Sequence, residues 1–221
     1  MVSFESYTTS YQDTMHRKAQ LLLFLATLLA SLASCNRQTP DMKLLEVTGP
    51  VRQVITQSYV SDHNGRMLQD TMSWNKRRME FDRDGELIRG TYYIDEGDTT
   101  SIRIYRDIKG KIILIQKYDP LCHRWFDTHI CYNDDGMVAE YDQESIDGES
   151  HYTCTYNAKG QLMEEKEVVT RGEPYQAITR YRITEEDQYG NWTRATARTD
   201  YDISGEKTTE YRIDIRQITY Y

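Results

Sequence analysis

The stretch Tyr156-Asn-Ala-Lys-Gly160-Gln-Leu162 is the clearest copy of the short pattern that decides the fold. An aromatic residue is followed four positions later by glycine and, two positions further on, by an apolar residue. A polar residue and glycine between two alternating runs are typical of a tight hairpin turn, because glycine readily adopts the positive φ that such turns need. The stretch therefore predicts two antiparallel strands joined near Gly160.

The same pattern recurs along the chain at intervals of roughly 25 residues, and recurrence with such a period indicates a supersecondary unit that packs on its neighbours. Close copies run from Phe81 to Leu87, from Tyr105 to Ile112 and from Tyr132 to Val138, and looser copies run from Tyr59 to Met67 and from Asp187 to Trp192. We therefore expect an all-β domain over residues 44–221. Its antiparallel meander of repeated hairpins would form a long curled sheet or an incomplete barrel.

Composition supports this fold class. The chain has 18 tyrosines but 4 phenylalanines, and tyrosine, threonine and isoleucine suit the half-buried surface of a sheet. The last strand alternates, with apolar residues on one face and charged residues on the other: Tyr211, Ile213 and Ile215 against Glu210, Arg212, Asp214 and Arg216. The formal net charge of −8 repels phosphate backbones, so nucleic acid is not an expected partner.

A second informative stretch, Leu32-Ala33-Ser34-Cys35, ends an apolar run that follows Arg17 and Lys18. Basic residues, an apolar centre and small residues before a cut are the parts of a secretory signal. The run is shorter than the roughly 20 apolar residues that span a bilayer. The pattern resembles the lipidation box of bacterial lipoproteins, although an ordinary cleaved signal with an incidental cysteine is the alternative.

The resemblance implies that residues 1–34 are a signal segment, that its helix precedes the β domain, and that Cys35 is lipidated. Translation is expected to start at Met15, since residues 1–14 are polar and carry Glu5 and Asp13. Residues 35–43 would be a lipidated tether. Asn36 in place of aspartate implies the outer membrane, with the domain facing the periplasm and the membrane as a partner through the lipid anchor.

The repeated units also resemble the tyrosine–aspartate (Rhs-like) β-repeats of bacterial surface proteins. The segments Gly190-Asn-Trp-Thr193 and Arg216-Gln-Ile-Thr-Tyr-Tyr221 are similar to small uncharacterised envelope lipoproteins built from such repeats. Three copies depart from the pattern, with Arg106, Asn133 and Asn157 where aspartate would follow the aromatic residue. The resemblance implies a scaffold or binding role and transfers no catalytic residue.

Three cysteines follow Cys35, namely Cys122, Cys131 and Cys154. An odd number leaves at least one of them unpaired within the chain. The proposed strands place Cys131 and Cys154 on opposite faces of the sheet. We expect free, buried thiols.

Residue types that bind metals gather once, as Cys122-His123 with His129 and Cys131. Zinc needs ligands that converge tetrahedrally. On a single strand, Cys122 would lie opposite the other three side chains. The sequence therefore predicts no metal site, and no cofactor motif is present.

Aromatic side chains are the remaining candidates for binding. The anchor tyrosines of the repeats, Tyr105, Tyr132 and Tyr156, are expected to pack unit on unit across the strands. Exposed rings that could form a weak binding surface are expected off the repeat position, at Tyr92, Trp125, Tyr141 and Trp192.

Three functions remain open on this basis. The favoured one is a non-enzymatic envelope lipoprotein that acts as a scaffold or binds an envelope protein or a glycan. The alternative is an envelope hydrolase that acts on glycan or peptide through acidic residues in a groove of the sheet, and no catalytic residue is assigned for it. A carrier of an apolar ligand would need a cavity with few internal charges.

Overall fold

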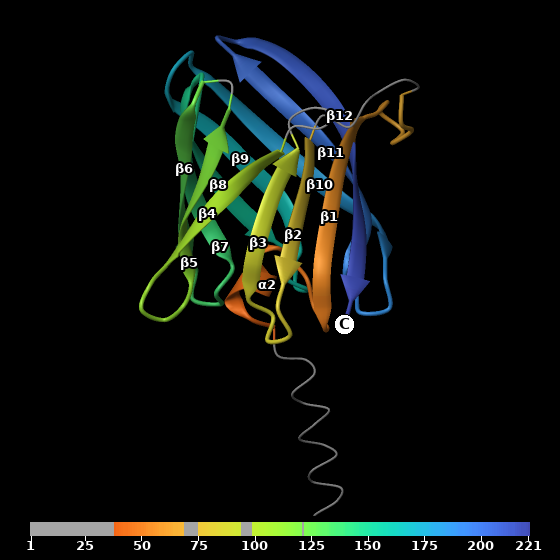
Figure 1. Ribbon diagram of the computed structural model, residues 1–221. Helices are drawn as coiled ribbons and strands as arrows, with labels where there is room; N and C mark the ends of the chain where they lie inside the picture. Colours follow the sequence, from red (N-terminus) through yellow and green to blue (C-terminus); the bar gives the residue numbers. More distant parts are fainter. Residues whose placement is uncertain (1–37, 69–74, 94–98, 121) are drawn as a thin grey trace, which may run out of the picture. The chain divides into compact units, whose positions relative to one another are not determined.

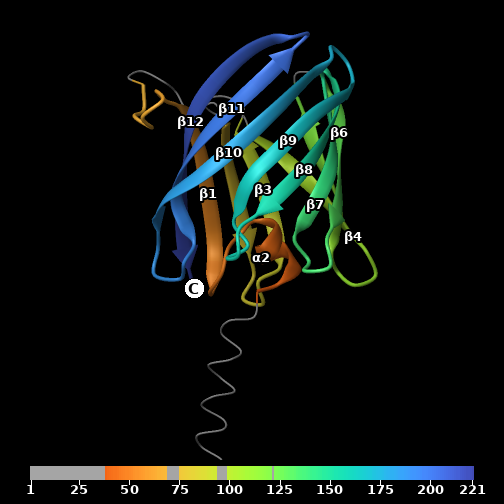
Figure 2. The same ribbon diagram turned by 180° about the vertical axis from the view of Figure 1, so that it is seen from behind.

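The computed structural model describes residues 38–68, 75–93, 99–120 and 122–221 of the chain. The expected signal segment and Cys35 lie outside these residues. The described unit, Gln38–Tyr221, is a β-barrel of twelve antiparallel strands with the short helix α2 (Pro40–Leu44) at one end (Figures 1 and 2).

Strands follow one another around the barrel in chain order. They are β1 (Val51–Val60), β2 (Asn75–Phe81), β3 (Leu87–Tyr93), β4 (Thr99–Arg106), β5 (Ile112–Asp119), β6 (Arg124–Tyr132), β7 (Val138–Ser145), β8 (Gly148–Tyr156), β9 (Leu162–Arg171), β10 (Tyr175–Glu186), β11 (Trp192–Ile203) and β12 (Glu206–Tyr220). The expected all-β antiparallel meander is confirmed.

Closure of the barrel corrects the expectation of a curled sheet or an incomplete barrel. β1 pairs with β12, so that Val54 lies opposite Ile218 and Tyr59 opposite Ile213. This pairing leaves neither the first nor the last strand as an edge with unpaired backbone groups. Local sequence patterns carry no signal for a contact between strands so far apart in the chain.

Five turns at one end of the barrel share a single plan, which explains the sequence repeat. In the turn between β2 and β3, Asp82 Oδ1 accepts the N–H groups of Asp84 and Glu86, both at 2.9 Å. Glycine three positions after the first residue has a φ of 76–81° in all five turns. This is a type I turn with a glycine bulge, and the equivalent first residues are Asp107, Asn133, Asn157 and Asp187.

The structure also shifts the expected alignment of the repeat at Tyr105 by one residue. Arg106 pairs with Ile112 and so takes the place that the anchor tyrosine holds in the following units. Asp107 then stands at the aspartate position, and Asn133 and Asn157 accept backbone N–H groups through Oδ1 in the same way. The departures from the tyrosine–aspartate pattern therefore keep the turn intact.

Residues 38–48 fill this end of the barrel, and we call them the plug. The sequence places residues 35–43 in a tether, but Pro40–Leu44 form α2, whose N-terminus is capped by the side chain of Thr39. Met42 and Val47 are buried in the main core cluster, with Val51, Val54, Met79, Phe81, Leu87, Ile112, Ile130 and Val138. Packing of these two residues fixes the segment in place.

Polar contacts join the plug to the turns. Thr39 Oγ1 donates to the carbonyl oxygen of Gly85 at 2.6 Å, and Lys43 Nζ donates to that of Asp135 at 2.7 Å. The side chain of Asn191, which is 1% exposed, accepts from the Thr48 N–H at 2.6 Å and donates to the Thr48 oxygen at 3.0 Å. The plug is thus held by several turns at once.

The wall of the barrel has two seams, where neighbouring strands leave a large part of their length unpaired. β3 and β4 pair at Thr91–Tyr93 with Thr99–Ser101, and β9 and β10 pair at Glu164–Val168 with Gln176–Arg180. Beyond the paired segments lie pockets of about 450 Å³ and about 550 Å³, respectively. Counted in either direction around the barrel, six strands lie between the two seams.

Candidate functional site

Strand pairing shows which side chains face the barrel interior. Val54 belongs to the core cluster, and alternation places Thr56 and Ser58 on the same inward face. Their partners on β12 are Arg216 and Asp214. The expected alternation of β12 is therefore present, and its charged row is the one that faces inward.

Glu165 of β9 lies among hydroxyl and guanidinium groups inside the barrel. Its carboxylate accepts from Tyr141 Oη at 2.7 Å and from Tyr181 Oη at 3.3 Å. Arg212 donates to Tyr181 Oη at 2.8 Å through Nη2, and its Nε donates to Asp214 Oδ2 at 3.2 Å. A continuous hydrogen-bonded chain therefore crosses the inner surface from β7 to β12.

Glu167 repeats this arrangement two residues further along β9. Its Oε1 accepts from Tyr152 Oη at 2.8 Å and from Tyr175 Oη at 2.7 Å. The rings of Tyr141 and Tyr152 stack with centroids 4.4 Å apart and planes 8° apart. We call the two glutamates and their four tyrosine donors the tyrosine–carboxylate cluster: Tyr141, Tyr152, Tyr175, Tyr181, Glu165 and Glu167.

The period of the strand explains why the cluster forms. β9 alternates so that Glu165 and Glu167 share the inward face, and Glu167 lies opposite Tyr152 on β8. Glu164 has the other parity and forms an ion pair with Arg180 at 2.9 Å. One strand thus divides its carboxylates between an inner tyrosine environment and an outer salt bridge.

The electrostatics keep the tyrosines as hydrogen-bond donors. Burial raises the pKa of the Glu165 carboxyl, although the hydroxyl of Tyr141 and the charge of Arg212 oppose this rise. Burial, and then the charge of Glu165, raise the pKa of Tyr141 and Tyr181 above the usual tyrosine value. A carboxylate has about four acceptor sites, so two tyrosine donors leave capacity for the hydroxyl or N–H groups of a ligand.

The exposure of the inner polar side chains decreases along the barrel axis, from the end opposite the plug toward the plug. Glu210, near the start of β12, is exposed, and Tyr201, whose hydroxyl lies 3.3 Å from it, is half-buried. Tyr152 and Tyr181 also keep partial exposure, whereas Arg216 is 5% exposed. Solvent therefore reaches the tyrosine–carboxylate cluster from the end opposite the plug.

Arg216 is the most buried of these inner polar residues, and it lies beside the plug. Its Cζ is 3.5 Å from the centre of the Trp192 ring, and the Trp192 Nε1 donates to Glu46 Oε2 at 2.7 Å. Burial lowers the pKa of Arg216 to about 9, against the opposing charge of Glu46. Arg216 Nε and Asp214 Oδ1 have no hydrogen-bond partner among the described residues.

The four aromatic residues expected to be exposed have separate locations. Tyr141 belongs to the tyrosine–carboxylate cluster, and Trp192 is 8% exposed, so the expectation of an exposed ring is wrong for Trp192. Tyr92 is half-buried on the inner face, opposite Arg77. Trp125 is half-buried on the outer wall, where the Arg103 Cζ lies 3.9 Å from its ring centre.

The anchor tyrosines do not all pack inward as expected. Tyr132 does so, and its hydroxyl donates to the Ile112 oxygen at 2.7 Å; burial raises its pKa to about 12. Tyr156 is also half-buried, and burial raises its pKa. Tyr105 is 44% exposed, because the corrected register gives its inward place to Arg106.

Sequence reasoning missed the two glutamates and three of the four tyrosines of the tyrosine–carboxylate cluster. The available signal was the run Glu164-Glu165-Lys166-Glu167, which puts two carboxylates on one face of a strand. The run indicates a site only once strand pairing places Tyr152, Tyr175 and Tyr181 around the two carboxylates.

The three cysteines in the described part of the chain are free thiols, and the expectation that they are buried is wrong for two of them. Cys122 and Cys131 are exposed, and Cys154 is half-buried. Cys131 pairs with Glu140 on the outer face while Cys154 pairs with Glu165 on the inner face, which confirms their opposite orientation. In the described segments no three His, Cys, Asp or Glu side chains gather in a metal-binding arrangement.

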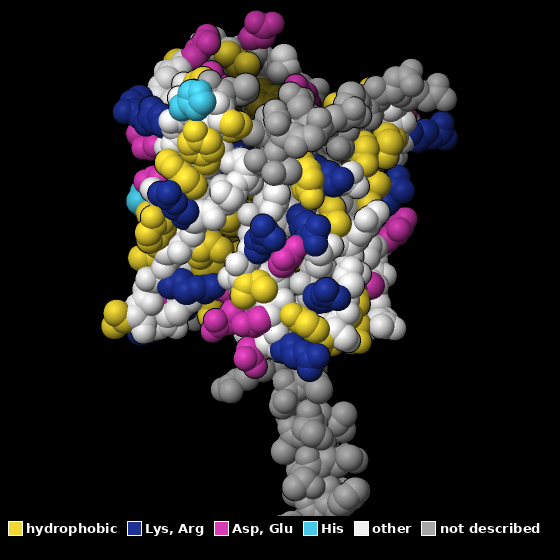
Figure 3. All heavy atoms as spheres, in the orientation of Figure 1, with side chains coloured by type: hydrophobic (Ala, Val, Ile, Leu, Met, Phe, Trp, Pro, Cys, Tyr) yellow, Lys and Arg dark blue, Asp and Glu magenta, His cyan; other side chains and the backbone are white. Residues whose placement is uncertain are grey.

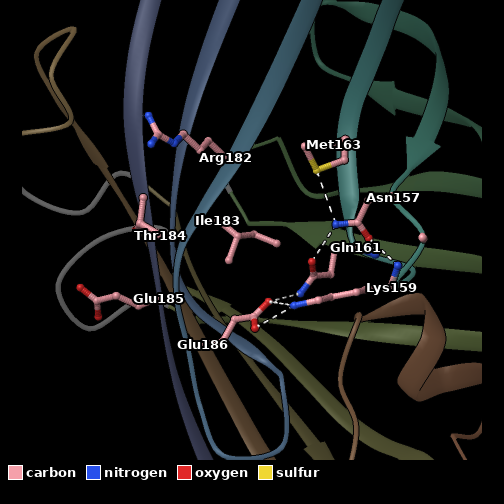
Figure 4. Close-up of a pocket in the computed structure, with 10 residues that line it drawn as sticks. Asn157, Lys159, Gln161, Met163, Arg182, Ile183, Thr184, Glu185 and Glu186 are labelled. Carbon is pink, nitrogen blue, oxygen red and sulfur yellow. Dashed lines mark hydrogen bonds and ion pairs between the residues drawn. The ribbon is translucent and has the colours of Figure 1, made fainter.

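The larger pocket of the wall lies apart from the tyrosine–carboxylate cluster. Figure 4 shows Ile183 pointing across it toward Gln161, while Arg182 and Glu185 point away. Lys159 Nζ and Gln161 Nε2 both donate to Glu186, at 3.1 and 2.8 Å, and so bridge the turns at one end of the opening. This pocket is a gap between strands with one lining ion pair, so it offers a ligand fewer fixed polar groups than the interior does.

Comparison with known proteins gives a distant structural match. The chain is similar to a porin-like protein from Bacteroides uniformis ATCC 8492, with a TM-score of 0.39 and 12% sequence identity, covering 78% of this chain and 99% of that one. No family model matches the chain, and no curated protein does. None of the helices in the described ranges has the length and apolar character needed to cross a membrane.

Proposed function

We propose that the protein is a lipid-anchored envelope barrel with a non-enzymatic binding role, and that its ligand is a glycan taken up at the tyrosine–carboxylate cluster. The observation that carries the proposal is the pair of inward carboxylates, each held by two tyrosine hydroxyls and each with acceptor sites to spare. Sugar hydroxyls suit such acceptors, and tyrosine rings offer an apolar face beside a polar group.

An anchor on Cys35 would hold one particular end of the barrel toward the membrane. Gln38, where the described barrel unit begins, follows Cys35 by three residues, and an extended chain spans at most about 3.3–3.6 Å per residue. A lipid on Cys35 would therefore hold the plugged end within about 11 Å of the bilayer. The solvent-accessible end of the tyrosine–carboxylate cluster would then face away from the membrane.

Charges on the outer wall support a barrel whose wall faces water and not lipid. Arg180 forms ion pairs with Glu164 at 2.9 Å and with Asp200 at 3.1 Å, and Arg78 pairs with Glu80 at 2.7 Å. Figure 3 shows further Lys and Arg side chains spread over one face of the barrel. A basic residue facing lipid costs about 2–4 kcal/mol at the middle of a bilayer.

Glycan binding by the full chain in detergent solution tests the ligand. Glu167→Gln removes one inward carboxylate, and Glu164→Gln is the matched control because Glu164 lies on the outer face of the same strand. We expect a glycan array to show binding that Glu164→Gln retains and Glu167→Gln loses. Equal binding by the two variants would place the glycan elsewhere.

In-cell crosslinking tests the other half of the proposal. A benzophenone amino acid placed at the position of exposed Glu210 would capture a ligand that enters at the solvent-accessible end. Capture of a glycan supports the proposal. Reproducible capture of a single envelope protein without glycan would replace it with the scaffold role. Replacement of Cys35 by serine would release the protein from the membrane fraction if the anchor is correct.

A hydrolase is the second candidate, because burial raises the pKa of Glu165 and a second carboxylate, Glu167, shares its face. Glycosidases place an acid and a second carboxylate on either side of the scissile bond. Glu165 and Glu167 instead project from one strand, two residues apart, which favours binding over hydrolysis. Turnover of an envelope glycan that is lost in Glu165→Gln would establish the hydrolase.

An apolar carrier fits the interior poorly. The inner face carries Glu165, Glu167, Arg212, Asp214 and Arg216. A lipid chain beside these groups would replace their water without offering hydrogen bonds, at a cost for each buried polar group.

A further inference from the structure

Positive charge gathers on the inner wall at the level of Thr56. This residue pairs with Arg216 on β12 and with Arg77 on β2, and Arg77 in turn pairs with Tyr92 on β3. Lys117 Nζ lies 5.0 Å from the centre of the Tyr92 ring. We call Arg77, Lys117 and Arg216 the inner cationic row.

The inner cationic row has little compensating negative charge. Within the described part of the chain, none of its three cations has a carboxylate oxygen within 4.0 Å. Glu46 contacts Arg216 through its backbone oxygen at 3.5 Å, and its carboxylate accepts from Trp192. The carboxylates of Glu46 and of Asp214, which is shared with Arg212, therefore stand against three positive charges, and neither contacts a member of the row.

Arg216 makes this imbalance costly. It is 5% exposed, and its Nε has no acceptor among the described residues. A buried guanidinium that no carboxylate contacts directly is unfavourable, and a buried donor without a partner adds to that cost. Two less buried arginines of this barrel each have a carboxylate: Arg106 has Asp41 at 2.7 Å, and Arg212 has Asp214 at 3.2 Å.

We propose that the inner cationic row binds the oxyanion group of a ligand, a phosphate or a carboxylate. The guanidinium groups of Arg77 and Arg216 match such a group in charge and geometry. Thr56, 7% exposed on the same inward face, adds a hydroxyl donor between them. Arg77 keeps partial exposure, so the ligand has a route to the buried Arg216.

This site goes beyond the proposed role, because it requires neither the lipid anchor nor the tyrosine–carboxylate cluster. Its residues come from β1, β2, β5 and β12, whereas the two glutamates of that cluster lie on β9. Loss of glycan binding would therefore leave the oxyanion site standing, and loss of the oxyanion site would leave the glycan proposal standing.

Titration calorimetry of the full chain in detergent tests the site with two probes, inorganic phosphate and acetate, at a total ionic strength held constant with sodium chloride. We expect saturable binding of at least one probe, and the preferred one identifies the ligand group. Arg77→Gln should weaken that binding about tenfold, since one charge-assisted hydrogen bond is removed. Lys117→Gln should weaken it less, because Lys117 is exposed and solvent screens its charge.

The matched control is Arg78→Gln, one residue away on the outer face of the same strand, where Arg78 pairs with Glu80 at 2.7 Å. Its affinity should equal that of the unaltered chain. Arg77 is partly exposed, so its replacement keeps the fold testable even if Arg216→Gln fails to fold. Absence of saturable binding by both probes, or equal weakening by Arg77→Gln and Arg78→Gln, would overturn the proposal.

Discussion

The plug and the inner face of β9–β12 both bury charge, and they do so in opposite ways. Asp41 in the plug is 2% exposed, and its two oxygens accept from Arg106 Nη1 and Nη2 at 2.7 Å each, while Oδ2 also accepts from the Leu87 N–H. On the inner face, Asp214 and Arg216 keep buried atoms without partners among the described residues.

This difference separates a structural region from a region that is available to ligands. A buried charge with all its hydrogen bonds made has nothing further to offer, and removing one partner leaves the other uncompensated. Carboxylates and cations with acceptor or donor capacity left over can bind something else. We therefore expect substitutions in the plug to change stability and substitutions on the inner face of β9–β12 to change binding.

Asp41→Ala should have the largest effect on stability. It leaves Arg106 without its carboxylate and the Leu87 N–H without its acceptor, and breaking such a buried pair costs about 3–5 kcal/mol. Urea unfolding measures the loss. Asp84→Ala, in the exposed part of the β2–β3 turn, should stay within about 0.5 kcal/mol. A similar loss for the two variants would remove the distinction between the regions.

Replacing both members of the pair sharpens the test. Asp41→Ala combined with Arg106→Leu removes the unpaired cation as well, so the double variant should recover part of the stability lost by the single one. Recovery identifies the uncompensated charge as the cause of the loss. A strictly additive double variant would instead indicate lost packing.

Gly85→Ala comes next in size and tests how closely the turns contact the plug. Both Gly85 and Gly110 have a φ near 80°, where an L-residue costs about 1–2 kcal/mol. A Cβ on Gly85 would also lie 2.7 Å from Met42 Sδ, whereas a Cβ on Gly110 meets nothing within 4 Å. Gly85→Ala should therefore lower the unfolding free energy more than Gly110→Ala does. Equal losses of unfolding free energy would show that the plug can move away from the added methyl group at little cost.

Glu165→Gln should have a smaller effect on stability, visible through its dependence on pH. Burial raises the folded-state pKa of Glu165 above the ordinary value of 4.5. Its stabilising contribution is therefore full below about 4.5 and is lost as the pH rises through the raised pKa. Glutamine has no charge to lose, so the variant should gain stability relative to the unaltered chain across that interval.

Unfolding free energies measured by urea titration from pH 4 to pH 8 check this sign. Glu164→Gln is the control, because Glu164 is on the outer face in an ion pair with Arg180. A relative stability of Glu165→Gln that falls with increasing pH would mean that the folded state favours the ionised carboxylate, and the inner face would then resemble the plug.

The plugged end was the more predictable region in its turns, and the reason is local. An Asp or Asn followed three residues later by glycine specifies the turn within a few residues, as at Asp82 and Gly85. The position of the plug was not predictable, because Thr39 and Asp41 read as a polar tether. Their positions depend on contacts with Arg106 and Gly85, which lie far away in the sequence.

The inner face was predictable in its alternation but not in its content. Arg212, Asp214 and Arg216 were placed on one face of a strand from their spacing. Inner faces are usually apolar, so periodicity gives no sign that this face is the inside of the barrel. This face becomes the inside of the barrel only when β1 pairs with β12, and that pairing depends on the position of every strand between them.

Ile108→Ala should have the smallest effect and completes the comparison within a single turn. Ile108 is fully exposed at the tip between β4 and β5, and Ile112 at the end of the same turn is 0% exposed in the core cluster. We expect Ile108→Ala to change the unfolding free energy by less than about 0.5 kcal/mol, and Ile112→Ala to lower it by about 2–5 kcal/mol. Urea unfolding of both variants measures the difference. A loss at Ile108 close to that at Ile112 would show that the turn tips, and not the buried contacts with the plug, carry the stability of this end.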